Sequence, residues 1–138
     1  MKNTRTFIVP GIPVQKSRPR VGKFGTYTPE KTVNYENLVK VCYMEEYANE
    51  EKFQGALILT AVFFFPIPKS YSKARKERIK KEKEYFVKSP DLDNLMKSIA
   101  DALNAIAYED DKQIFEAHIV KKYTEGNPRA EVLIEEIE

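Results

Sequence analysis

The sequence predicts an α+β fold of the α/β kind, in which residues 1–138 form a single domain with a mixed β-sheet flanked by helices. The run ALILTAVFFF at residues 56–65 is almost wholly apolar, as in a central strand. Residues 90–107 have the spacing of an amphipathic helix, and two strand-like segments follow them. A length of 138 residues suits one domain, and neither an internal repeat nor an interdomain linker divides the chain.

The N-terminal part predicts a strand, a basic loop and a helix. Residues 6–10 have the composition of a short strand, and residues 11–25 are expected to form a loop because three glycines and two prolines interrupt them. Thr28 is expected to cap a helix over residues 29–48, with Pro29 at its first helical position. The expected core contacts of this helix are Val33, Leu38, Val41 and Met44.

Three predictions concern the central part of the chain. The strand at residues 56–65 should be covered on both sides, because both of its alternating faces are apolar. Residues 72–84 have a Lys or Arg in almost every turn, which predicts an exposed helix anchored only by Ala74 and Ile79. In the helix at residues 90–107, six apolar side chains fall on one arc: Leu92, Leu95, Met96, Ile99, Leu103 and Ile106.

Two further strands, residues 113–123 and 129–137, are expected at the C-terminus. The turn EGNP lies between them at residues 125–128, so the two strands should pair as a hairpin.

Charge and cysteine content narrow the class of protein. The net charge is only +2, but residues 69–88 carry nine basic and three acidic side chains, which suggests a polyanionic partner. Cys42 is the single cysteine, so no disulfide framework forms within the chain and a reducing compartment is favoured. The first apolar run, residues 7–9, is too short for a secretory signal or a membrane span. A soluble cytoplasmic protein without a membrane partner is therefore expected.

Polar side chains share one face of the helix predicted at residues 90–107. At 100° per residue, Asp93, Lys97, Asp101 and Asn104 fall within about 80° of one another. This face is opposite the apolar arc, so we expect it to be free for chemistry.

Three more aspartates flank this face. Asp91 precedes it, and Asp110 and Asp111 lie at the start of the next strand, so a helix packed on its sheet could bring them to the same end. Carboxylates about 4 Å apart repel by roughly 4 kcal/mol at an effective dielectric near 20, which a divalent cation would offset. Oxygen ligands without a His or Cys cluster favour magnesium, with manganese as a possible substitute, over zinc. Such a metal can activate water for attack on a phosphodiester, and Lys97 would add positive charge at the phosphate.

Each of these features also has an ordinary structural explanation. Asp91 or Asp93 could complement a helix N-terminus, and Asp93 with Lys97 could be an exposed ion pair. Asp110 with Asp111 could form a turn. The combination of the acidic residues with the lysine favours a metal site over any of these explanations taken alone.

Basic residues are expected to contact a nucleic acid in two places. The first is the loop at residues 11–25, whose four cations are interleaved with Phe24 and followed by Tyr27, a mixture that suits phosphate contacts and base stacking. The second is the helix at residues 72–84, although a charged helix of this kind is commonly solvated surface. The residues concerned are Lys16, Arg18, Arg20 and Lys23 of the loop, and Lys73 and Lys76 of the helix.

Three blocks of sequence resemble one family. PDLDNLMK at residues 90–97, DALN at residues 101–104 and DDKQ at residues 110–113 are similar, in order and spacing, to the RusA family of Holliday junction resolvases. The similarity begins at IVPG and covers nearly the whole chain, in the form met in phage and prophage members. Ala105 departs from it, because many members have Gly after the Asn.

The resemblance implies a RusA-like fold and a homodimer that makes paired, symmetrical nicks in four-way DNA junctions with magnesium. It implies that Asp91, Asp93 and Asp111 are the catalytic carboxylates that bind the metal. Lys97 would be the catalytic lysine, and Asp110 a further metal ligand.

These observations lead to one functional hypothesis and two alternatives. We expect a magnesium-dependent, structure-specific endonuclease that acts on branched DNA and resolves four-way junctions by paired phosphodiester hydrolysis in recombination and repair. One alternative is a non-catalytic DNA-binding protein that uses the basic loop and the basic helix. The other is a nuclease for flaps or other branched DNA.

Overall fold

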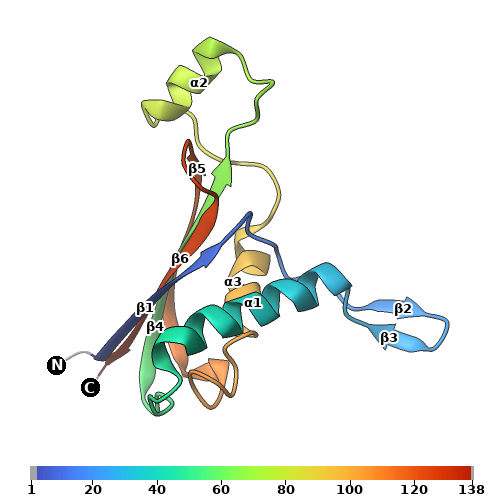
Figure 1. The fold of residues 1–138 in the computed structure, drawn as a ribbon, viewed down its shortest axis with the longest axis vertical. Coiled ribbons are helices and arrows are strands. Elements are labelled where there is room, and N and C mark those ends of the chain that lie inside the picture. The colour runs from blue at the N-terminus through green and yellow to red at the C-terminus, as the bar shows by residue number, and fades with distance from the viewer. Residues whose placement is uncertain (1–2, 138) are drawn as a thin grey trace.

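Four strands form one mixed sheet in the order β1-β6-β4-β5 in the computed structural model, which describes residues 3–137 (Figure 1). β4 runs antiparallel to β6 and parallel to β5, and β1 runs antiparallel to β6. This arrangement confirms the predicted mixed sheet and α+β class. The strands are β1 (Asn3–Pro10), β4 (Ala56–Pro66), β5 (Ile114–Thr124) and β6 (Arg129–Ile137).

The predicted C-terminal hairpin is wrong, because β4 lies between β5 and β6. The four residues that connect β5 to β6 cross the end of β4, a span of two interstrand spacings, or about 10 Å. β4 is the most apolar strand, and a central position gives its backbone hydrogen-bond partners on both sides. The more polar β5 occupies an edge instead.

The strand β4 is central as predicted, but only one of its faces is fully buried. Its residues alternate between buried and half-buried, with Leu59, Ala61 and Phe63 in the core. Thr60 and Val62 on the other face are half-buried. Within one copy of the chain the prediction that both faces are covered is therefore wrong, because the second face of β4 is only half-buried.

Two helices, α1 (Glu30–Tyr47) and α3 (Leu92–Ala100), pack against the sheet (Figure 1). The buried side chains of α1 are Thr32, Tyr35, Val39 and Tyr43. Leu38 is half-buried against the core as expected, but Val33, Val41 and Met44 are exposed. Apolar residues occur all around α1, so its buried stripe could not be recognised from hydrophobicity.

The start of α1 also differs from the prediction. Pro29, and not Thr28, is the residue that precedes the helix, and no side chain caps it. The carbonyl of Pro29 accepts from the backbone N–H groups of Thr32 and Val33.

The helix expected over residues 90–107 ends at Ala100, and turns follow it up to Tyr108. Ala105 has a φ of 65°, a left-handed conformation that interrupts a helix. The Tyr108 hydroxyl donates to the carbonyl of Ala100 at 2.6 Å and so satisfies the end of the helix. The apolar spacing continues past the end because Leu103 still packs into the core.

Two parts of the chain project from this body (Figure 1). The first is a hairpin of β2 (Arg20–Gly22) and β3 (Gly25–Tyr27), in a segment that was expected to be an irregular loop. The second contains α2 (Lys73–Lys80), which is shorter than expected and is capped by the Ser72 hydroxyl. In α2, Ile79 is buried as predicted, whereas Ala74 is exposed. Within residues 3–137, no helix has both the length and the apolar character needed to cross a membrane.

Candidate active site

The start of α3 carries two of the predicted catalytic carboxylates. Asp91 is the residue before the helix, and its carboxylate makes no hydrogen bond to the helix end. Asp93 lies in the first turn, where Oδ1 accepts from the backbone N–H of Asn94 at 2.9 Å. Both side chains are exposed, as is Lys97 one turn later. The three groups therefore face solvent and are accessible to a large substrate.

The segment that enters α3 is fixed to the sheet by a lysine of β5. Lys121 Nζ donates to the carbonyl oxygens of Lys88 at 2.8 Å and Pro90 at 2.9 Å. These bonds set the position from which Asp91 and Asp93 project.

Asp111 begins a tightly bonded turn, η1 (Asp111–Gln113), directly before β5, and Asp110 caps this turn. Asp110 Oδ1 accepts from the Lys112 N–H at 2.9 Å, and Gln113 Oε1 accepts from the N–H of Asp110 at 3.1 Å. Gln113 Nε2 donates to the carbonyls of Phe53 and Gly55. The block of sequence DDKQ is thus a capping box that attaches the aspartates to the body of the protein.

The two aspartates of this turn have opposite pKa shifts. The hydrogen bond from the backbone of Lys112 lowers the pKa of Asp110. Burial, a hydrogen bond with Asp110 and the negative charges of Asp110 and Asp101 raise the pKa of Asp111. Asp111 therefore lies close to other carboxylates, and a bound cation would relieve the repulsion between their negative charges.

Asn104 connects this turn to the segment after α3. Its side-chain carbonyl accepts from the Asp111 N–H at 3.1 Å. Since the helix ends at Ala100, Asn104 does not lie on the helical face predicted for it, but it still reaches the aspartates. The sequence groups Asn104 with the polar residues of α3, but it does not predict that Asn104 orients Asp111.

Lys16 lies between two carboxylates at the centre of the molecule. Its ammonium is 2.7 Å from Glu36 Oε2 on α1 and 3.5 Å from Asp101 Oδ2 at the end of α3. Its backbone N–H donates to the Asn94 carbonyl. Burial alone would lower the pKa of Lys16, but the two carboxylates more than offset it and the pKa is raised. Glu36 was not predicted as a site residue, because nothing in the sequence relates it to Lys16 or Asp101.

The predicted metal ligands are not assembled into one cluster. Over residues 3–137, His, Cys, Asp and Glu side chains form no group of three or more that could hold a metal ion. The donor chemistry nevertheless fits a hard cation, since Asp91, Asp93 and Asp111 offer only carboxylate oxygens. Asp91 in particular is exposed and has no cap hydrogen bond to break. Binding a shared ion would require these side chains to turn toward one another.

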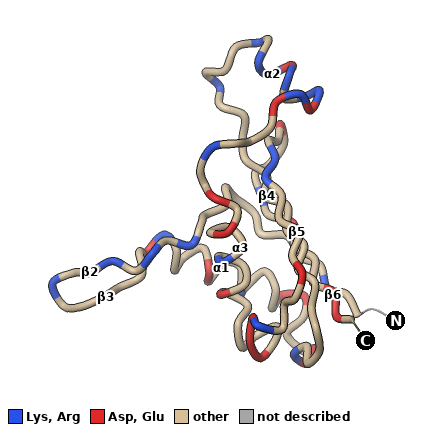
Figure 2. The backbone as a smooth tube through the Cα atoms, turned by 180° about the vertical axis from the view of Figure 1, so that it is seen from behind, with Lys and Arg blue, Asp and Glu red and all other residues tan. Residues whose placement is uncertain are grey.

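The remaining predicted DNA-contacting residues lie on the two projections (Figure 2). Arg18 and Arg20 lie at the base of the β2–β3 hairpin and Lys23 at its tip, and all three are exposed. Lys73 and Lys76 are on α2, where Lys76 Nζ donates to the Lys69 carbonyl at 3.3 Å.

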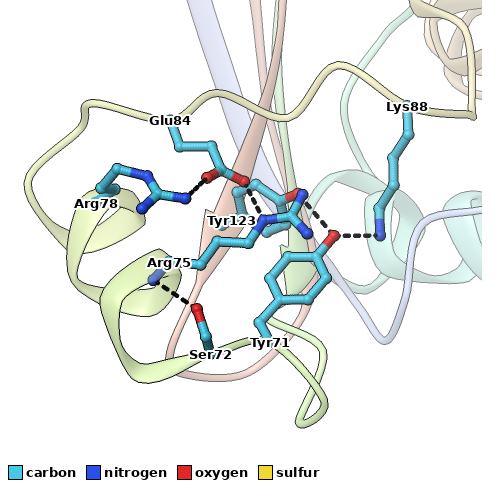
Figure 3. A network of polar contacts seen from close by, with 7 residues as sticks. All are labelled: Tyr71, Ser72, Arg75, Arg78, Glu84, Lys88 and Tyr123. Atoms are coloured by element: carbon cyan, nitrogen blue, oxygen red, sulfur yellow. Dashed lines mark hydrogen bonds and ion pairs between the residues drawn. The ribbon is translucent and has the colours of Figure 1, made fainter.

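A network of polar contacts attaches the α2 projection to the body (Figure 3). Arg75 Nε donates to Glu84 Oε2 at 2.7 Å, and its guanidinium lies 3.6 Å from the centre of the Tyr71 ring. The Tyr71 hydroxyl is 3.5 Å from that of Tyr123 on β5 and accepts from Lys88 Nζ at 3.1 Å. The network joins α2 both to the sheet and to the segment that leads into Asp91.

The chain is similar to known proteins over nearly its whole length. The family model described as Endodeoxyribonuclease RusA matches residues 10–135, which include every aspartate discussed above. Among curated proteins, the chain is 34% identical over 137 residues to "Uncharacterized protein YqaN" of Bacillus subtilis (strain 168). The alignment covers 95% of both chains.

Proposed function

Because the chain belongs to the Endodeoxyribonuclease RusA family, we propose that it is a magnesium-dependent endonuclease that resolves four-way DNA junctions in recombination and repair. Family membership gives the class of reaction, which is hydrolysis within a DNA strand. The observation that supports the choice of site is the placement of Asp111, which is held by Asn104 and lies beside Asp110 directly before β5. Burial, and then the neighbouring carboxyl groups of Asp110 and Asp101, raise the pKa of Asp111. A divalent cation would relieve the repulsion between these groups.

In this proposal Asp91, Asp93 and Asp111 hold the metal, and Asp110 stands beside them as a further ligand. Without a cation, carboxylates repel one another by roughly 4 kcal/mol at 4 Å, which favours their separation. A bound magnesium or manganese ion would supply a Lewis acid for the phosphate and a water of lowered pKa. The cut would leave a 5′-phosphate and a 3′-hydroxyl.

Lys97 is proposed to stabilise negative charge that develops on the phosphate. It is exposed and lies one helical turn after Asp93, a spacing that puts both side chains on the same side of α3. A fixed cation near the phosphate stabilises the transition state more than the ground state.

Paired cuts in a junction require two active sites, so we propose a homodimer. A surface suited to this lies on β1, where Ile8 is exposed, and it continues over the half-buried Val62 and Leu133. These residues line an open groove of about 550 Å³ together with polar side chains, among them Thr60 and Glu131. A groove of mixed apolar and polar character suits an interface between subunits.

An assay of the purified protein on a labelled four-way junction tests the function. The proposal predicts symmetrical nicks in magnesium and none in EDTA. Binding without any nick would identify a non-catalytic DNA-binding protein. Faster cutting of a flap than of the junction would instead identify a nuclease for other branched DNA.

A further inference from the structure

The β2–β3 hairpin projects from the body of the protein as an arm (Figures 1 and 2). Apolar side chains on this arm are exposed to solvent. Three cross-strand pairs form it, and the two-residue turn at its tip consists of Lys23 and Phe24. Phe24 is 98% exposed, and Val21 on the adjoining strand is 86% exposed. A large aromatic side chain exposed together with a second apolar side chain on a projecting arm suits a contact surface.

The arm holds its tip in a defined conformation. Gly25 has a φ of 117°, which L side chains rarely adopt. A Cβ on Gly22 would lie 2.9 Å from Cε1 of Tyr27, so the Tyr27 ring packs closely over this glycine. These two features fix the turn from which the Phe24 ring projects.

The charge around Phe24 indicates what it contacts. Residues 10–29 include four cations and no Asp or Glu. Arg18, Arg20 and Lys23 are exposed, and Lys23 Nζ lies 5.7 Å from the centre of the Phe24 ring. An aromatic ring among cations is complementary to a polyanion that also offers flat apolar faces, which is the chemistry of a nucleic acid with an accessible base. A two-stranded ribbon also has the width of a DNA major groove.

We propose that Phe24 stacks on a base at the branch point of the DNA, while Arg18, Arg20 and Lys23 bind the flanking phosphates. In an uninterrupted duplex each base is stacked on both sides, whereas at a branch point the strands exchange between helices and the stack can be opened there at a lower cost. Apolar side chains inserted at base steps are a known means of holding distorted DNA. The arm would thus select branched over linear DNA. This inference rests on the proposed function, because it takes branched DNA as the substrate.

The chain has no tryptophan, which allows a direct test. Phe24→Trp places a single indole at the tip, and stacking on a base should quench its fluorescence. We expect a clear loss of indole fluorescence when a four-way junction is added in calcium, a measurement that does not depend on cleavage. Linear duplex of equal length should cause little change. Val41→Trp, on an exposed position of α1, is the matched fluorophore control.

Phe24→Ala is expected to weaken junction binding roughly 5- to 100-fold, since a base loses its stacking partner. Val21→Ala removes an exposed apolar side chain from the same arm without removing an aromatic face, and should bind the junction much more tightly than Phe24→Ala. An unchanged circular dichroism spectrum would show that both variants are folded.

The proposal would be overturned if linear duplex quenched the fluorescence of Phe24→Trp as strongly as the junction does. It would also be overturned if neither DNA quenched it. A lower molecular mass in sedimentation for Phe24→Ala would assign the arm to a second copy of the chain and overturn it as well. Quenching by junction DNA in a protein that never nicks it would reject the nuclease function and retain the stacking role.

Discussion

The backbone N–H of Asp111 donates to the side-chain oxygen of Asn104 across 3.1 Å, and this bond joins two separate blocks of the acidic sequence pattern. The turn after α3 thereby orients the turn before β5. Asn104 is a positioning residue, because it acts on the site through Asp111.

Asn104→Ala is predicted to slow junction cleavage by roughly 10- to 100-fold, because small misplacement of a reacting group is costly. Loss of one exposed hydrogen bond should lower the free energy of unfolding by only about 1 kcal/mol. Single-turnover cleavage rates and urea unfolding would measure the two effects. Asn37→Ala, on an exposed position of α1, serves as the control. A normal cleavage rate for Asn104→Ala would remove the residue from the site.

Lys16→Met is predicted to lower the free energy of unfolding by about 1 kcal/mol at pH 7, because Glu36 and Asp101 lose their shared cation. The pKa of Lys16 is raised above its usual value near 10.5, so folding favours the charged amine. The stabilisation is therefore fully present below pH 10.5 and is lost as the pH rises through the higher folded pKa. Urea unfolding of both proteins between pH 7 and 11 should show the difference shrinking at the alkaline end. A constant difference would mean that Lys16 acts through packing alone.

Magnesium is predicted to stabilise the wild-type protein but not Asp91→Asn. A ligand at ten times its Kd adds about 1.4 kcal/mol, which corresponds to a rise in Tm of roughly 4 °C for a domain of this size. Thermal unfolding with and without magnesium measures it, without any need for DNA. Glu109→Gln, an exposed acidic residue close in sequence to the Asp110 turn, should keep the full rise. The same rise in Asp91→Asn would show that the metal binds elsewhere.

A triple variant in which Arg18, Arg20 and Lys23 are each replaced by Ala is predicted to bind the junction more weakly. Its binding should also depend less on salt concentration. Three lost phosphate contacts should reduce the slope of log K against log salt by about 2 to 3. Filter binding at several salt concentrations in calcium gives the slope. Lys40→Ala on α1 is the control, and a triple variant with the wild-type slope would show that the arm does not bind phosphates.

Replacing Lys73 and Lys76 with Ala tests the α2 projection in the same way. If both lysines contact phosphates, their loss should reduce the slope of log K against log salt by about 2. Because the Tyr71 and Arg75 network is unaffected, the projection should keep its position. An unchanged slope would identify α2 as solvated surface.

Much of the fold followed from the sequence, but strand order did not. The bounds of β6 agree with the prediction, and those of β4 differ by one residue, because apolar and branched residues mark both strands. The hairpin of β5 and β6 was predicted wrongly because a turn sequence shows where the chain reverses. It does not show whether a third strand, here β4, lies between the two strands. Likewise, the apolar spacing reveals neither that the Tyr108 hydroxyl caps the end of α3 at Ala100 nor that Ala105 has a left-handed conformation.

The candidate site was only partly predictable for a similar reason. The blocks around Asp93 and Asp111 stand out in the sequence by their spacing. Contacts between distant segments, such as Lys16 with Glu36, depend on how α1 crosses α3 and leave no pattern in the chain.

The metal-dependent nuclease function is tested most directly by the rate at which Asp93→Asn cleaves a labelled four-way junction. Removing one ligand charge is predicted to reduce cleavage in magnesium by roughly 100-fold or more, while junction binding in calcium persists. Cleavage by Asp93→Asn at the wild-type rate would contradict the assignment of this carboxylate to the metal and to phosphodiester hydrolysis.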